Sequence, residues 1–309
     1  MKRLIRKIAK MIASIIQSEL PSLISNQSNF SETELLAIGK LLCNQQRNFI
    51  SESLSEYEFK VFSQWGEDGI IQHLINNIHI DNTVFVEFGV ENYQESNTRF
   101  LMMNNNWRGL VIDSSKENIA YIKNQEWYWK YDLEAVCAFV DCENINKLLD
   151  NYRNIGILSI DIDGNDYHIM NAIDFHKINP SILICEYNSV FGKDRSITVP
   201  YDKYFNRTEK HYSNLYFGSS LPALTNLAKQ KGYSLVGGCS NGVNAFFVRN
   251  DLLTDVICEK SIEDVYIESR TRESRSIDGS LSYLSGLERY KIIKGMKVLN
   301  TISGHLEDL

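Results

Sequence analysis

The sequence of 309 residues predicts an α/β domain built on a sheet of seven strands, with helices on both faces and the last strand antiparallel. Short apolar segments recur between residues 84 and 249, and helical patterns lie between successive segments up to the sixth. Strands of nearly continuous apolar character that alternate with helices are typical of a parallel sheet covered on both faces. Only CSNGV separates the last two segments, and its Asn241-Gly242 pair is typical of a hairpin turn, so the seventh strand is expected to run antiparallel beside the sixth.

The expected strands coincide with the apolar segments, and the helical segments fill the sequence between them. The clearest helix is LPALTNLAKQKG, which ends on Gly232, as is common for a helix C-terminus. The seven strands are expected at residues 84–88, 109–113, 136–140, 156–161, 181–186, 233–238 and 244–249.

Two extensions flank this domain. In residues 1–20, apolar side chains recur at helical spacing opposite basic ones, which predicts an amphipathic helix. Two uses of this helix stay open: docking on its own domain or on a second copy in a homo-oligomer, or peripheral contact with an anionic membrane surface. SETE at 31–34 resembles a capping box and predicts a second helix that ends near residue 45. The expected parts are a helical N-terminal extension, a central α/β domain and a C-terminal extension that packs on the core, at residues 1–60, 61–250 and 251–309.

Composition excludes several classes of protein. A net charge of -7, from 32 basic and 39 acidic residues, argues against a protein that binds duplex nucleic acid. No stretch approaches about 18 consecutive apolar residues, so no transmembrane segment is expected. The six cysteines are scattered without the spacing of a zinc site, which indicates reduced thiols in a cytoplasmic protein, at most peripheral to the inner face of the membrane.

Polar residues follow the first three expected strands, and ligands of open α/β sheets bind at such strand ends. The first strand ends in Glu87, Phe88 and Gly89, where the glycine either lets a ligand approach the backbone or makes an ordinary tight turn. The G-x-G-x-x-G of dinucleotide-binding proteins is missing, which favours a cofactor without phosphates. Asp113, after the second strand, can accept both hydroxyls of a ribose or cap the next helix. Asp141, after the third, can likewise reach an adenine amine or cap a helix.

The fourth strand runs into an acidic corner, DIDGND, at residues 161–166. One interpretation is a turn followed by a helix cap, which needs no function. The other is that carboxylates this close repel one another unless a substrate, a sulfonium, a shared proton or a hard metal ion such as Mg²⁺ relieves them. Candidate metal ligands are Asp161, Asp163 and Glu186, the last at the end of the fifth strand. His168 is either a general base or a helix-end residue without a catalytic role.

Six segments of the chain form a set by their order and spacing: FSQWGEDGII, FVEFGVENYQESNT, WRGLVIDSS, LSIDIDGNDYHI, ICEYNSVFG and YFGSSLPALTNLAKQKGYSLVG. Together, over roughly residues 60–250, they resemble the FkbM-like family of S-adenosylmethionine-dependent methyltransferases, especially bacterial members linked to surface polysaccharides. The resemblance implies the Rossmann-like, seven-stranded sheet of class I methyltransferases, which the expected terminal hairpin also fits.

This resemblance implies an enzyme that transfers a methyl group from S-adenosyl-L-methionine to oxygen, commonly to a sugar hydroxyl in polysaccharide or glycan biosynthesis. Glu87 and Gly89 match the first cofactor motif of the family, Asp113 its ribose-binding acid and Asp161 the fourth-strand acid beside the reacting methyl. Asp161 or Asp163 would take the proton of the hydroxyl, or a divalent ion held by them would lower its pKa.

One departure from the family concerns the cofactor pocket. Family members usually carry another glycine shortly after the first, where this chain has VENYQES. Because larger side chains stand there, Asn92 and Tyr93 are expected to narrow the pocket.

The C-terminal extension contains a cluster of charged residues with two interpretations. The cluster would form a lid over the acceptor side of the site, where arginines suit a phosphorylated or acidic glycan. The alternative is a set of ordinary surface salt bridges. The residues are Arg270, Arg272, Glu273 and Arg275.

Two other functions compete with methyl transfer. An oxidoreductase with a nicotinamide cofactor would require phosphate-binding glycines that this sequence lacks. A catalytically silent domain that recruits glycan-assembly partners to a membrane through residues 1–20 would bind lipid and show no turnover. A measurement of S-adenosylmethionine binding would distinguish a methyltransferase from the oxidoreductase and from the silent domain.

Overall fold

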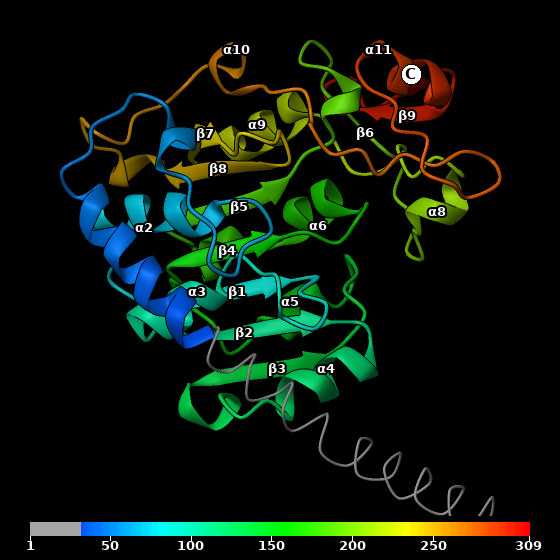
Figure 1. Cartoon of the computed structure of the whole chain (residues 1–309). Coiled ribbons are helices and arrows are strands. Elements are labelled where there is room, and N and C mark those ends of the chain that lie inside the picture. Colours follow the sequence, from blue (N-terminus) through cyan, green and yellow to red (C-terminus); the bar gives the residue numbers. More distant parts are fainter. Residues whose placement is uncertain (1–31) are drawn as a thin grey trace, which may run out of the picture.

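The computed structural model describes residues 32–309, and the amphipathic helix expected within residues 1–20 lies outside them. A seven-stranded sheet forms the centre of the molecule (Figure 1), which confirms the predicted fold class. Its strands are β1 (Val84–Phe88), β2 (Arg108–Asp113), β3 (Leu133–Cys137), β4 (Ile157–Ile160), β5 (Ile182–Glu186), β7 (Tyr233–Gly238) and β8 (Asn244–Arg249).

The strands of this sheet follow the order β3-β2-β1-β4-β5-β8-β7. β1 lies at the centre and pairs in parallel with β2 on one side and β4 on the other. The chain passes from one half of the sheet to the other between β3 and β4, so the switch point, where such sheets bind ligands, lies between β1 and β4. β8 runs antiparallel between β5 and β7. The hairpin predicted from Asn241-Gly242 is therefore confirmed.

Each face of the sheet has its own helices and its own apolar core, because successive side chains of a strand point to opposite faces. The helices are α2 (Glu67–Asn77), α3 (Arg99–Asn105), α4 (Lys116–Lys123), α5 (Ile145–Leu148), α6 (Asp166–Ala172), α7 (Phe175–Ile178) and α9 (Leu221–Gln230). On one face, Val86 and Leu158 pack with side chains of α5, α6 and α9. On the other, Phe85 and Ile157 pack with α2, α3 and α4. Burial on both faces explains the nearly unbroken apolar sequence of the central strands.

The third strand lies three residues earlier than the predicted 136–140, because one of its faces is not covered. Leu133 and Ala135 of β3 are buried, whereas Glu134 between them is exposed. The apolar run that suggested the strand continues into the following loop, where Phe139 is 44% exposed. A strand with one covered face alternates in polarity, so a search for continuous apolar character misplaces it.

A second sheet, of three strands, was not predicted. Its strands are β6 (Ile197–Thr198), β9 (Lys297–Asn300) and β10 (Leu306–Asp308), and the nearby helices are η3 (Ser189–Phe191), α8 (Arg207–Lys210) and α11 (Leu287–Ile293). Helix α10 (Ile262–Val265) packs instead against β7 and α9 of the large sheet. β9 pairs antiparallel with β6 and with β10. In Figure 1 the C-terminal strands, drawn in red, therefore lie beside the green segment that holds β6. The C-terminal extension thus packs on a segment inserted between β5 and α9.

Residues 32–46 are helical, which confirms the second predicted helix, although its expected capping serine lies outside the described residues. This helix packs through Cys43 against Val61, Phe62 and Phe100 of the α/β domain. Short 3₁₀ turns complete the chain at η1 (Leu54–Tyr57), η2 (Tyr128–Lys130) and η4 (Asn250–Leu252). Among residues 32–309, no helix has both the length and the apolar character needed to cross a membrane.

Candidate active site

A cavity of about 780 Å³ lies at the carboxyl ends of β1, β2, β4 and β5, next to the switch point of the sheet. The strand ends and the loops after them form its inner wall. Its outer wall includes residues 205–217 and 269–273, so the C-terminal extension covers one side. This position and size are typical of a small-molecule site in an α/β protein.

Gly89 allows the end of β1 to lie against the end of β4. Its φ angle is 71°, in the left-handed region that favours glycine. A Cβ atom at this position would lie 1.7 Å from the backbone oxygen of Asp161. Any side chain here would push the two strand ends apart, so the geometry of the cavity floor depends on this glycine.

Glu87, the neighbouring acid on β1, is buried and fully occupied by hydrogen bonds. Its carboxylate accepts from Ser96 Oγ and Asn97 N at 2.8 Å each, and from Thr98 N at 3.1 Å. Burial raises the pKa of Glu87, and these hydrogen bonds oppose that shift. Glu87 therefore fixes the loop that precedes α3, and Ser96 and Asn97 of this loop line the cavity.

Asp113 stands at the tip of β2 and lines the cavity, where the sequence placed it. Its carboxylate accepts from the backbone N–H of Glu91 at 2.9 Å and of Ser115 at 2.8 Å, and from Asn118 Nδ2 at 3.2 Å. The cap of α4 itself is Ser115, whose side chain accepts from the N–H of Asn118. Asp113 is thus held in a fixed position facing the cavity, next to a helix that has its own cap.

Asn92 and Tyr93 do not narrow the cavity, so that expectation is wrong: neither residue lines it. Tyr93 is fully buried in the apolar core, with its hydroxyl 2.9 Å from Thr98 Oγ1. Glu91 and Tyr93 have φ angles of 46° and 61°, the left-handed conformation that a second glycine would adopt without strain. This backbone path places the tyrosine ring in the core.

Asp141 does not line the cavity. It accepts hydrogen bonds from the backbone N–H of Glu143 and Asn144, each at 2.8 Å, just before α5. Lys203 lies 2.8 Å from its other oxygen, and this contact lowers the pKa of Asp141. Asp141 therefore holds the turn before α5, whose cap position is Asn144, and its role is local and structural rather than one in binding.

His168 also lies away from the cavity lining. Its Nε2 is 2.8 Å from the carbonyl oxygen of Val199, so this nitrogen carries a proton and donates. Burial lowers the pKa of His168, and the ring packs edge to face with Tyr201. A neutral imidazole that donates to a backbone carbonyl is a structural group of the interface between α6 and the β6 segment.

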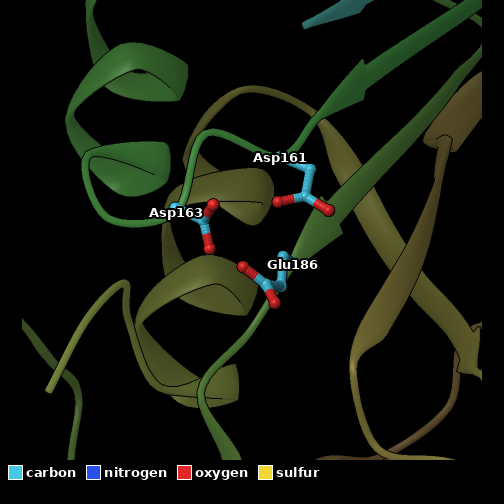
Figure 2. Close-up of side chains that lie close together, drawn as sticks. All are labelled: Asp161, Asp163 and Glu186. Carbon is cyan, nitrogen blue, oxygen red and sulfur yellow. The ribbon is translucent and has the colours of Figure 1, made fainter. Parts of the chain in front are cut away.

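Asp161, Asp163 and Glu186 converge just beyond the ends of β4 and β5, as Figure 2 shows. One carboxylate oxygen from each of the three lies within 4.8 Å of the others. Asp166 has a different role, because it accepts from the backbone N–H of Ile162 at 2.8 Å and fixes the turn before α6. The structure thus brings together three acids from two strand ends, as the sequence suggested.

Asp161 and Glu186 accept no hydrogen bond from any residue in the described part of the chain. The Oε2 atom of Glu186 is buried without a partner. Burial, followed by the charges of neighbouring carboxylates, raises the pKa of both groups well above the usual range. Carboxyl groups with raised pKa and unoccupied oxygens in a cavity are candidates for proton transfer.

Arg207 joins the acidic corner to the C-terminal extension. One guanidinium nitrogen lies 2.7 Å from Asp163, and another lies 2.7 Å from Glu273. The guanidinium also lies over the ring of Phe217, 3.9 Å from its centroid. Burial lowers the pKa of Arg207, but Glu186, Glu273 and Asp163 outweigh it and raise the pKa overall. This side chain is therefore a permanent cation at the edge of the acidic corner.

Sequence reasoning missed Arg207, and it also missed Phe139 and Arg289, which line the same cavity. Phe139 would have been found if β3 had been placed correctly, because it then follows the carboxyl end of that strand. No pattern in the sequence around Arg207 or Arg289 indicates that these residues belong to the site. Their positions depend on contacts with segments far away in the sequence.

Solved structures with similar folds include S-adenosylmethionine-dependent methyltransferases. One from Clostridium acetobutylicum ATCC 824 is 11% identical, with a TM-score of 0.39 over 59% of this chain and 90% of that one. An O-methyltransferase from Bacillus cereus, in complex with SAH, is 13% identical, with a TM-score of 0.38 over 70% of this chain and 88% of that one. No match is found among curated proteins.

The fold, a seven-stranded sheet with an antiparallel terminal hairpin, is that of a class I methyltransferase. The model of the methyltransferase FkbM domain matches residues 70–235, which is more than half of the chain. The chain therefore belongs to the FkbM methyltransferase family, and the resemblance found in the sequence is confirmed. The protein is a methyltransferase that uses S-adenosylmethionine.

Proposed function

We propose that this enzyme methylates the oxygen of a sugar hydroxyl in the assembly of a polysaccharide or another glycan. The observation that carries the proposal is a single cavity that is lined by Gly89 and Asp113 and also by the unoccupied carboxylates of Asp161 and Glu186. Methyl transfer to oxygen requires an aligned nucleophile and a group that takes its proton. Carboxylates with raised pKa supply that group for a hydroxylic acceptor.

The ends of β1 and β2 fit S-adenosylmethionine. Gly89 permits close approach to the backbone, and Asp113 would accept the ribose hydroxyls. Phe139 and Val140 line the cavity after β3 and offer apolar surface for the adenine ring, whereas Asp141, which the sequence had suggested as a partner of the adenine amine, does not line it. The cofactor supplies an electrophilic methyl group on a positively charged sulfur. Unpaired carboxylates nearby favour that charge.

Asp161 is our candidate for the proton acceptor. Because its carboxylate receives no hydrogen bond from the described residues, a bound hydroxyl would be its first donor. Asp163 is less suited, because Arg207 already binds it at 2.7 Å. Burial and then the charges of Asp163 and Asp166, which raise the pKa of Asp161, would strengthen its basicity.

A Mg²⁺ ion held by the same carboxylates is the alternative way to activate a hydroxyl. The donor set consists of oxygen atoms, which a hard cation prefers. However, Asp163 is bonded to Arg207, so an ion with all three acids as ligands would have to displace the guanidinium. The fit is incomplete, and we propose proton transfer without a metal.

We place the enzyme in the cytoplasm, since its six cysteines are unpaired thiols, as in a reducing compartment. The basic helix expected within residues 1–20 would contact the inner face of the membrane or a second copy of the chain. Flotation with anionic vesicles and sedimentation of the full chain, compared with a chain that lacks these residues, would distinguish the two uses.

The test of the proposed function is transfer of labelled methyl groups from S-adenosylmethionine to a panel of sugars and polysaccharides, with and without EDTA. We expect label on a sugar oxygen and the same rate with the chelator. A rate that EDTA abolishes and Mg²⁺ restores would establish the metal route instead. Absence of transfer by a folded protein that binds vesicles would support the recruiting domain.

A further inference from the structure

The outer wall of the cavity contains two arginines, Arg272 and Arg289, that belong to the C-terminal extension. Arg289, on α11, is only 3% exposed. Its Nε donates to the carbonyl oxygen of Leu284 at 3.0 Å and its Nη1 to that of Ser269 at 2.8 Å. Arg272 is exposed, and its Nη1 reaches the same Leu284 oxygen at 3.5 Å. The two guanidinium groups therefore share one carbonyl oxygen.

Neither arginine forms an ion pair with any described carboxylate within 4.0 Å. Glu273, which lies next to Arg272 in the chain, is bound to Arg207 instead. Burial and then repulsion by Arg272 lower the pKa of Arg289, and Glu268 and Glu273 offset this only from beyond ion-pair distance. A buried guanidinium without a counterion is costly, so an anion beside it would be stabilising.

Arg207, which lines the same cavity, differs from Arg272 and Arg289 because it has carboxylate partners. It is paired with both Asp163 and Glu273 and lies between the acidic corner and the arginine pair. The cavity thus has one end with excess negative charge and an outer wall with excess positive charge. A ligand that spans both would place a hydroxyl at the acids and an anionic group at the arginines.

We infer that Arg272 and Arg289 bind a carboxylate or phosphate carried by the acceptor, so that the acceptor is an anionic sugar. This inference rests on the proposed function and adds the substrate class. A guanidinium fork matches the two oxygens of either anion, and two forks around one anion remove their mutual repulsion. Both arginines also lie outside residues 70–235, the part that the family model covers. Residues beyond that shared domain suit the acceptor better than the cofactor that the family has in common.

The test measures binding of three probes to the protein saturated with S-adenosylhomocysteine: glucuronate, glucose 1-phosphate and glucose. Calorimetry or ligand-observed NMR would give the affinities for wild type, Arg272→Gln, Arg289→Gln and the control Arg270→Gln. Arg270 lies in the same loop and is exposed, but it does not line the cavity.

We expect one of the two anionic sugars to bind at least about 10-fold more tightly than glucose, and the tighter one identifies the anion. Arg272→Gln and Arg289→Gln should each weaken it by about 10-fold or more, while Arg270→Gln leaves it unchanged. Because Arg272 is exposed, its variant keeps the test decisive if Arg289→Gln fails to fold.

Three results would overturn the inference: equal binding of glucose and the anions, no binding of either anion, or unchanged anion affinity in Arg272→Gln. Titrations with S-adenosylhomocysteine and methylthioadenosine add a further arm. If Arg272→Gln weakened only the former, the arginines would hold the carboxylate of the cofactor, and the inference would be wrong. Failure of the wild type to bind S-adenosylhomocysteine would contradict the proposed function itself.

Discussion

The carboxylates at the ends of β1 and β2 differ from those at the ends of β4 and β5, although all four strands are neighbours in one sheet. Glu87 and Asp113 each accept three or more hydrogen bonds from nearby backbone and side-chain donors. Asp161 and Glu186 accept none from residues 32–309. The first pair shapes the loops of the cavity, and the second pair keeps its oxygens free for a ligand.

This difference shows that position at a strand end does not by itself assign chemistry. Buried polar groups in folded proteins are usually hydrogen-bonded, so an unpartnered carboxylate oxygen calls for an explanation. A ligand that donates a proton or a hydrogen bond is the explanation favoured by the cavity around Asp161 and Glu186. The comparison therefore separates residues on the cofactor side of the site from residues whose oxygens stay free for the reaction.

The largest effect is expected from Asp161→Asn. Removal of a general base costs about 100-fold to 10,000-fold in rate, while S-adenosylhomocysteine should bind nearly as well as before. The measurement is the initial rate with the acceptor found in the glycan screen. Asp163→Asn is the control, because Arg207 already occupies that carboxylate, and it should cost less. Full activity in Asp161→Asn would remove Asp161 from the mechanism.

A stability effect is expected from Glu87→Gln. The amide would present an NH₂ group to donors that now share one carboxylate, and leaving buried donors unsatisfied costs about 1–3 kcal/mol. Urea denaturation should show the lower free energy of unfolding. An unchanged value would mean that Glu87 does not fix this loop.

Glu186→Gln should raise the stability of the folded protein, whereas Glu87→Gln lowers it. The effect of Glu186→Gln should also depend on pH. The pKa of Glu186 is raised in the folded protein, so the folded state binds the proton more tightly than the unfolded state, whose carboxyl titrates near about 4.3. This carboxyl therefore favours the folded state at low pH, and that stability is lost as the pH rises through its folded pKa. Thermal unfolding should show a higher Tm for Glu186→Gln than for wild type at pH 8. The difference should shrink toward pH 4.5, and a difference independent of pH would contradict the assignment.

The smallest effect is expected from Tyr93→Phe, which tests whether this side chain lies in the core. Loss of its hydrogen bond to Thr98 should cost about 0.5–1.5 kcal/mol of stability. The affinity for S-adenosylhomocysteine should not change, because Tyr93 does not line the cavity. A large gain in affinity would show that the ring obstructs the pocket after all.

Strands that are buried along their whole length could be predicted from the sequence, because burial on both faces requires a nearly continuous apolar run. β1, β7 and β8 have the predicted bounds, although β7 is an edge strand, whereas β3 does not, since its exposed residues break the apolar run. No sequence pattern of this kind indicates the small sheet, because β6 has two residues and its partner β9 lies about 100 residues later in the chain.

Some residues of the candidate site could likewise be predicted from the sequence, and others could not. Asp161, Asp163 and Glu186 could be grouped because parallel strands end at one edge of a sheet, and the structure places them together. Arg207 and Arg289 could not be found, because their importance depends on distant partners such as Asp163 and Ser269. Asp141 shows the reverse case, since a strand-end acid can be fully used by the turn before a helix and by a lysine.

The most direct test of this account is calorimetric titration of S-adenosylhomocysteine into wild type, Asp113→Ala and Asp161→Asn. Hydrogen bonds to a charged group contribute about 1.5–3 kcal/mol, so Asp113→Ala should weaken binding by about 10-fold to 100-fold, whereas Asp161→Asn should keep it. That result would place the cofactor at the end of β2 and reserve the end of β4 for the reaction. Loss of binding in Asp161→Asn with full affinity in Asp113→Ala would contradict the division between the two pairs of carboxylates.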